Sequence, residues 1–192
     1  SIITPYKYDK LKKEYYFAIS YTYSDILIIL YNKLNIQSKS NELLNKLDYR
    51  PFFMKEFNDP WLLSNAGSSC ELLSEATENN VLTCFFMSNS NNKYFSSVSF
   101  LPDKNFSVIS NYTYTLDIED FDIENLKSIK TAHNEKTKSL ICFTNTVKAK
   151  CIIYNAIDHQ LTQTNSELPS CKDDSYANNI YYFQKTKEFI FS

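Results

Sequence analysis

Short runs of aromatic and β-branched residues, each bounded by Asn, Ser, Asp or Lys, recur along the whole chain. Runs of this kind predict β-strands, and hardly any stretch repeats its apolar residues with the period of about 3.6 residues that a helix requires. The chain is therefore expected to be mainly β. The expected strands are Glu14–Tyr21, Asp25–Tyr31, Cys70–Glu75, Val81–Met87, Tyr94–Leu101, Asn125–Thr131, Ser139–Phe143, Lys150–Asn155, Asn179–Gln184 and Glu188–Phe191.

Two short helical segments are also expected. Leu43, Leu44 and Leu47 follow Ser40 at a spacing that places them on one stripe of a helix. Further along the chain, Asp59-Pro60 supplies an N-cap and a proline at the first helical position.

Four segments resemble one another, because each consists of a polar opener followed by a buried strand: Lys13–Ser20, Asn80–Met87, Lys138–Thr144 and Lys187–Ser192. Their spacing is compatible with propeller blades of about 40–50 residues that carry insertions. Residues 1–192 are thus expected to form a single β domain, or a segment of a larger β-propeller with a partial ring of blades. A β-sandwich accounts for the strands but not for the repetition, and it is the alternative.

The cysteine positions fit two β-hairpins. A turn centred on Thr77 places Cys70 directly opposite Cys84, and a two-residue loop at Thr146-Val147 places Cys142 opposite Cys151. Directly opposed residues have the short Cβ separation that a disulfide needs, so one disulfide is expected within each hairpin. Buried, reduced thiols are the alternative.

The fifth cysteine, Cys171, then lacks a partner, and it is expected to pair outside residues 1–192 or to stay free. The strand expected at Glu188–Phe191 ends without a turn signal. Together with the incomplete ring, these features predict either a continuation of this chain or another protein chain that completes the sheet.

Composition excludes several classes of function. Lys and Arg number 20 against 22 Asp and Glu, and Arg50 is the single arginine, so a nucleic-acid partner is not expected. The chain has a single Gly, so it can form neither a glycine-rich phosphate-binding loop nor a nucleophile elbow. Asn is therefore expected to supply most residues with positive φ. The longest apolar run is only strand-sized, so membrane insertion is not expected.

No assembled catalytic or metal site can be recognised. The acidic run at residues 117–124 lacks the glycine and the ordered spacing of a calcium loop. His133 and His159 lie at no zinc-ligand spacing from the cysteines and near no nucleophile motif. A single arginine cannot form the carboxylate-binding cluster of a sialidase. We therefore expect no enzyme, no cofactor and no metal, with a carbohydrate-active propeller enzyme as the alternative.

Two expected strands contain three consecutive aromatic residues each, and neighbouring side chains in a strand point to opposite faces. Both faces of each strand therefore carry aromatic residues, whereas an ordinary core needs them on one face only. In a propeller, neighbouring blades cover both faces; otherwise such residues form a protein-binding surface. The edge of the last strand is a second candidate for pairing with another chain. The interface candidates are Tyr15, Tyr16, Phe17, Tyr181, Tyr182, Phe183, Glu188, Phe189 and Phe191.

Two further features suit a secreted or cell-surface protein. The chain starts at Ser1 without Met, which suits either a mature product after removal of a signal peptide or a domain cut from a longer chain. Asn105-Phe-Ser and Asn111-Tyr-Thr are N-glycosylation sequons, which make Asn105 and Asn111 glycosylation candidates.

The bias toward Asn, Lys, Tyr, Ile and Phe, with the expected Cys70–Cys84 and Cys142–Cys151 pairs on their strands, resembles the cysteine-rich protective antigens of malaria parasites. The resemblance covers about half of the chain and includes no signature motif. It implies a propeller without enzymatic activity that acts as a scaffold in a host-cell invasion complex, with a host-cell surface protein as a candidate partner. A structural half-domain that completes a partner's ring is the alternative.

Overall fold

The computed structural model describes residues 1–23, 26–50, 63–88, 94–116, 126, 128–144, 149–163, 180–183, 186 and 188–191. These residues form fourteen strands and one short 3₁₀ segment, η1 (Pro102–Lys104), and they contain no α-helix. The prediction of a mainly β chain is confirmed.

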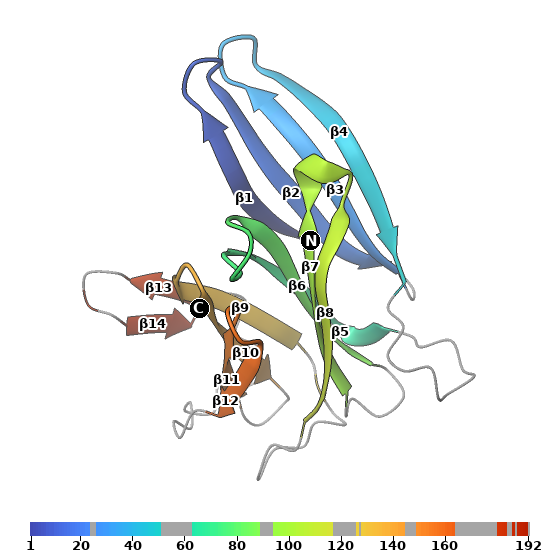
Figure 1. Ribbon diagram of the computed structural model, residues 1–192, viewed down its shortest axis with the longest axis vertical. Coiled ribbons are helices and arrows are strands. Elements are labelled where there is room, and N and C mark those ends of the chain that lie inside the picture. Colours follow the sequence, from blue (N-terminus) through green and yellow to red (C-terminus); the bar gives the residue numbers. More distant parts are fainter. Residues whose placement is uncertain are drawn as a thin grey trace.

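Twelve of the strands form three four-stranded antiparallel sheets, in which strands that follow one another along the chain pair with each other (Figure 1). Sheet A contains β1 (Ile2–Asp9), β2 (Glu14–Tyr23), β3 (Ile26–Asn35) and β4 (Ser40–Tyr49). Sheet B contains β5 (Leu63–Leu73), β6 (Val81–Ser88), β7 (Tyr94–Leu101) and β8 (Ser107–Thr115). Sheet C contains β9 (Ser128–Glu135), β10 (Lys138–Thr144), β11 (Ala149–Asn155) and β12 (Gln160–Gln163). The remaining pair is β13 (Ile180–Phe183) with β14 (Glu188–Phe191).

The four similar segments occupy equivalent positions. They form the second strand of each sheet, β2, β6 and β10, and the second strand of the last pair, β14. Four strands were not anticipated, namely β1, β4, β8 and β12, because their exposed residues are polar or mixed. Each of them lies at the edge of its sheet.

The helix expected after Ser40 is wrong, because residues 40–49 form β4 and pair with β3 along their whole length. A β-bulge opposite Tyr31 and Asn32 inserts one extra residue into β4. The bulge lets Leu47 pack on the core while Leu43 stays exposed, so a helix-like spacing of leucines is accommodated in a strand. The turn expected at Asp59-Pro60 lies outside the described residues.

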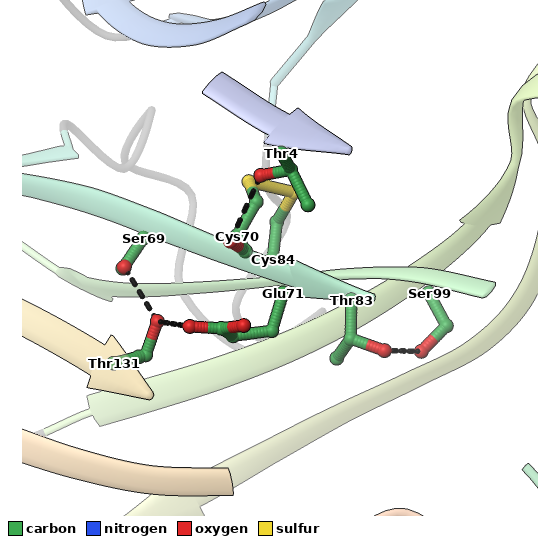
Figure 2. Close-up of a disulfide and its surroundings, with 8 residues drawn as sticks. All are labelled: Thr4, Ser69, Cys70, Glu71, Thr83, Cys84, Ser99 and Thr131. Carbon is green, nitrogen blue, oxygen red and sulfur yellow. Dashed lines mark hydrogen bonds between the residues drawn. A yellow bond between two sulfur atoms is a disulfide. The ribbon is translucent and has the colours of Figure 1, made fainter. Parts of the chain in front are cut away.

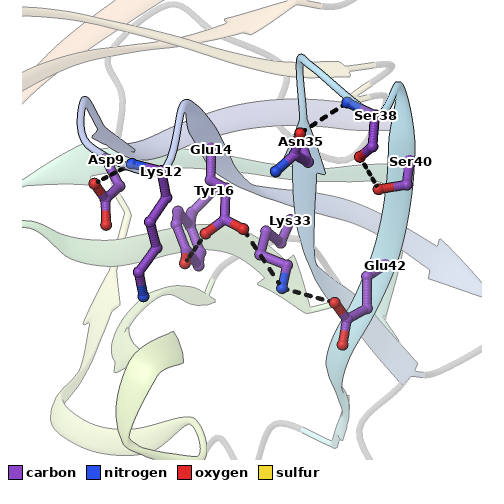
Figure 3. Close-up of polar contacts among 9 residues, drawn as sticks. All are labelled: Asp9, Lys12, Glu14, Tyr16, Lys33, Asn35, Ser38, Ser40 and Glu42. Carbon is purple, nitrogen blue, oxygen red and sulfur yellow. Dashed lines mark hydrogen bonds and ion pairs between the residues drawn. The ribbon is translucent and has the colours of Figure 1, made fainter.

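Three hairpin loops share one design despite the scarcity of glycine. Loops 10–13, 36–39 and 156–159 each follow an Asp or Asn and end on a residue with positive φ, namely Lys13, Lys39 or His159. In Figure 3 the Asp9 carboxylate accepts the amide of Lys12 (3.1 Å), and the Asn35 side chain accepts that of Ser38 (3.0 Å). The Asx side chain thus replaces a missing backbone partner.

Asparagine supplies fewer left-handed residues than expected. In the described part of the chain, the non-glycine residues with positive φ are Lys13, Lys39, Asn80, Asn105, Phe106 and His159. The expectation that asparagine provides most of them is therefore wrong, since its main role in these hairpins is to open the loop.

Sheet B lies between sheets A and C and is covered on both faces (Figure 1). Leu82, Cys84 and Phe86 of β6 pack against sheet A, whereas Phe85 and Met87 pack against sheet C. Residues 81–87 are all buried. The first strands of successive sheets also lie close together, because β5 contacts both β1 and β9, and β13 contacts β9.

Both predicted disulfides are present, and each lies within one sheet. Cys70 of β5 bonds to Cys84 of β6 (Figure 2), and Cys142 of β10 bonds to Cys151 of β11. In both pairs the two residues are direct register partners with Cα atoms 4.1 Å apart. Cys171 lies outside the described residues.

The Cys70–Cys84 disulfide closes a short loop, so its loss should enlarge the unfolded ensemble and destabilise the fold. We expect a Cys70→Ala/Cys84→Ala variant to lose about 3 kcal/mol of unfolding free energy in urea titrations. Peptide mapping under non-reducing conditions gives the direct check. A cross-link from Cys70 to Cys142 or Cys151 would contradict the pairing.

Candidate interaction surface

Sheet A has two different faces. Its inner face packs on sheet B through Tyr6, Ala18, Leu27, Ile29 and Tyr31, all of which are buried. The buried hydroxyl of Thr4 donates to the carbonyl of Cys70 (3.0 Å), which ties β1 to the disulfide-bearing strand β5 (Figure 2).

The carboxylate of Asp103 contacts two residues on the inner side of sheet A. Asp103 lies in the η1 segment that connects β7 to β8, and its carboxylate accepts a hydrogen bond from the hydroxyl of Tyr31 and forms a 2.6 Å ion pair with Lys7. Burial and the nearby carboxylate of Asp103 together raise the pKa of Tyr31 well above its usual value, and they raise the pKa of Tyr6 to about 12. Both phenols are therefore neutral at any physiological pH, and that of Tyr31 donates to Asp103.

The outer face of sheet A carries no charge on three of its four strands. Because side chains alternate across a strand, the register partners of the outward residues of β2 also point outward. The outward residues of β1, β2 and β3 are Ile3, Pro5, Tyr8, Tyr15, Phe17, Ile19, Tyr21, Tyr23, Ile26, Ile28, Leu30, Asn32 and Leu34. We call this set the outer face.

The outer face is open to solvent at Ile3, Pro5, Tyr8, Tyr15, Tyr23 and Leu34, whereas Ile28 and Asn32 near its centre are buried and the remaining members are partly buried. Tyr23 is 70% exposed, Ile3 66% and Tyr15 44%. Tyr15 also stacks on Tyr8 of the neighbouring strand, with ring centroids 4.3 Å apart. A sheet that faces water on one side normally alternates apolar and polar residues, so this face has the composition of a covered one.

Charged residues return at β4, which forms the rim. Lys46 and Asp48 face outward opposite Leu30 and Ile28, and they form a 3.0 Å ion pair with each other. The outward residues of the rim therefore carry both signs and no net charge.

The interface residues expected in β2 lie on both faces of sheet A. Tyr15 and Phe17 lie on the outer face, whereas Tyr16 lies on the inner side and is partly buried. In Figure 3 the hydroxyl of Tyr16 donates to Glu14 (2.9 Å), and Glu14 lies beside the Lys33–Glu42 ion pair. The ammonium of Lys7 lies 4.6 Å from the centre of the Tyr16 ring.

The other expected interface residues fall in the last strand pair. Tyr181, Tyr182 and Phe183 belong to β13, and Glu188, Phe189 and Phe191 belong to β14. The two strands pair antiparallel, with Tyr182 opposite Phe189. Their side chains lie outside the described residues.

Sequence reasoning missed the part of the outer face that β1 and the end of β3 contribute, above all Ile3, Tyr8 and Leu34. The available signal was the two-sided apolar pattern of Ile26–Leu30, in which no position is polar. Such a run predicts a strand with both faces covered, and it implies that neighbouring strands share the outer face.

A polar cluster joins the first strands of sheets B and C. The carboxylate of Glu71 accepts the hydroxyl of Thr131 (2.9 Å), and Thr131 exchanges a 2.7 Å hydrogen bond with Ser69 (Figure 2). The other oxygen of Glu71 lies 2.7 Å from Nδ1 of His133. This hydrogen bond with Glu71 raises the pKa of His133, against the opposing effect of burial.

The second histidine links the outer strands of sheets B and C. His159 stacks on Tyr112 of β8 with ring centroids 4.1 Å apart, and its Nδ1 lies 2.8 Å from the hydroxyl of Tyr154. The hydroxyl of Tyr114 donates to the carbonyl of His159 (2.7 Å). These contacts occupy the ring and backbone of His159 in structural roles.

Both sequon asparagines are exposed, near the seam between sheets A and B. Asn105 follows η1, and its side-chain oxygen accepts a hydrogen bond from Asn45 of β4 (2.7 Å). Asn111 lies in β8, where its side-chain nitrogen is 3.5 Å from the hydroxyl of Tyr49.

The described residues offer neither a membrane-spanning helix nor a cluster of metal ligands. They contain no helix long and apolar enough to cross a membrane, and no group of three or more potential metal ligands. The acidic run at residues 117–124 lies outside them.

Comparison with known proteins gave no match: no family model fits the chain, and neither a curated protein nor a solved structure is similar to it. The outer face must therefore be interpreted from its own geometry.

Asp103 holds sheet A on sheet B, and its removal leaves a buried phenol and a lysine without their shared partner. We expect Asp103→Ala to lower the unfolding free energy by about 1–3 kcal/mol in urea titrations. Asp48→Ala removes a carboxylate from the exposed rim pair and serves as the control, with an expected loss below about 1 kcal/mol. Equal losses for the two variants would contradict the role of Asp103.

The Glu71–His133 pair should make stability depend on pH. The pKa of His133 is raised in the folded protein, so its stabilising effect is fully present below the unfolded pKa of about 6.5 and disappears as pH rises through the folded pKa. Urea titrations should show His133→Gln to be more costly at acid pH than at alkaline pH. In a Glu71→Gln background this pH dependence should vanish, and its persistence there would assign it to another group.

Proposed function

We propose that this protein is a non-enzymatic secreted scaffold, built as part of a β-propeller, that acts by holding another polypeptide chain against the outer face of sheet A. The observation that carries this proposal is the exposed, uncharged outer face. Exposed apolar patches of this kind are typical of protein-binding sites, and tyrosine is enriched there because it buries a large area with few rotatable bonds.

The sheet arrangement supports the propeller part of the proposal. Four-stranded antiparallel meanders are the unit of a propeller blade, and the first strand of each blade lies next to that of its neighbour around the axis. Sheets A, B and C follow the meander order, and β5 contacts both β1 and β9. In such an array each sheet face packs against another sheet, and the apolar composition of the outer face fits a face that another sheet covers.

The two disulfides favour an oxidising, extracellular setting, because such bonds persist outside the reducing cytosol. Secretion and exposed sequons at Asn105 and Asn111 are consistent with one another. The resemblance to protective antigens leads us to propose that the scaffold belongs to a cell-surface complex that takes part in host-cell invasion.

The proposal is tested with a photoreactive probe on the outer face. Tyr15 is replaced by p-benzoylphenylalanine, and the protein is irradiated in an extract of its source cells. We expect covalent capture of a polypeptide at position 15, because the benzophenone reacts only with what lies directly on the face. The matched control carries the probe at Leu11, which is 97% exposed but lies in the β1–β2 loop. Equal capture at both positions, or none at Tyr15, would refute the proposal.

A further inference from the structure

We infer that the polypeptide that covers the outer face is a second copy of this chain, which presents its own outer face in a two-fold, sheet-to-sheet dimer. This inference rests on the proposed function, because it names the partner of the same surface. Such an interface is isologous: the same patch of residues is used by both subunits.

The charge distribution of the outer face favours a second copy as its partner. A charged side chain that is buried at an interface without a partner is costly, and like charges brought together suppress wrong partners. The outward residues of β1, β2 and β3 include no Asp, Glu, Lys or Arg. Two copies can therefore bring these strands together without burying or opposing any charge.

The rim is also self-complementary. Outward on β4, Lys46 and Asp48 carry opposite signs and already neutralise each other at 3.0 Å. A partner recognised through its own net charge would require a rim of one sign, whereas a second copy requires a rim that does not repel itself. The rim of sheet A meets the second condition.

A second copy can offer only a sheet face that its own sheets leave uncovered. Both faces of sheet B are covered, and on the far face of sheet C the residues Leu140, Cys142 and Cys151 are buried. Within the described residues, the outer face is thus the apolar sheet face that remains open. A second copy can match it with the same face, which makes the dimer two-fold rather than head-to-tail.

The size of the face is sufficient for a dimer. With strands about 4.8 Å apart and a rise of about 3.3 Å per residue, a four-stranded sheet of ten-residue strands covers about 600 Å². Two such faces bury about 1,200 Å² in total, which is the lower limit of the interfaces that hold stable complexes. The sheet-on-sheet mode is already used twice in this chain, between sheets A and B and between sheets B and C.

Sedimentation equilibrium of the purified full chain tests the inference. We expect the wild-type protein to be a dimer at micromolar concentration and Ile3→Lys/Tyr23→Lys to raise the dissociation constant by about tenfold or more. Both side chains are strongly exposed, so the variant should keep the wild-type unfolding midpoint. Leu11→Lys introduces the same charge into the β1–β2 loop and should leave the dimer intact.

The probe at Tyr15 separates the second-copy inference from the proposed function. In the purified protein it should yield a homodimer whose cross-linked peptides come from the outer faces of both copies. A monomer in isolation whose probe captures a different polypeptide in the extract would overturn the second-copy inference and leave the proposed function standing. Absence of capture in both settings would overturn both. A dimer that dissociates with Leu11→Lys, or cross-links outside sheet A, would also overturn the inference.

Discussion

The side chains of β6 pack against two other sheets at once, and the architecture of the described residues depends on this double burial. Alternate residues of one strand supply the core between sheets A and B and the core between sheets B and C. Since apolar burial is the main favourable term in folding, both neighbours are held by the same central sheet. Apolar packing holds the sheets together, and the polar contacts at Thr4, Asp103 and Glu71 fix how neighbouring sheets are positioned on each other.

The same constraint explains which parts of the fold could be predicted. Strands that are buried on both faces, such as Val81–Met87, are nearly continuous apolar runs, here interrupted only by Thr83, and they are readily predicted as strands. The cysteines could be paired because a hairpin places residues opposite each other by simple counting from the turn. The edge strand β8 could not be recognised, because Ser, Asn and Thr alternate irregularly with its apolar residues and its exposed residues are mixed in polarity.

β4 could not be predicted as a strand for a different reason. Its leucines have helical spacing, and only the long hydrogen-bonded pairing with β3, together with a bulge, makes it a strand. Tertiary pairing of that kind leaves no local trace in the sequence. For the candidate surface, Tyr15 and Phe17 could be identified from their own strand, whereas Ile3 and Tyr8 join them only through the register of β1.

The placement of the two disulfides bears on how such a repetitive chain arose. Cys84 and Cys142 both lie in the second strand of their sheets, yet Cys84 bonds back to the first strand and Cys142 bonds forward to the third. One bond lies in the core between sheets A and B, and the other lies on the face of sheet C that is turned away from sheet B. No superposition of one sheet on the other brings the two bonds together. If the sheets descend from one duplicated ancestor, at least one of these two cross-links arose after the duplication.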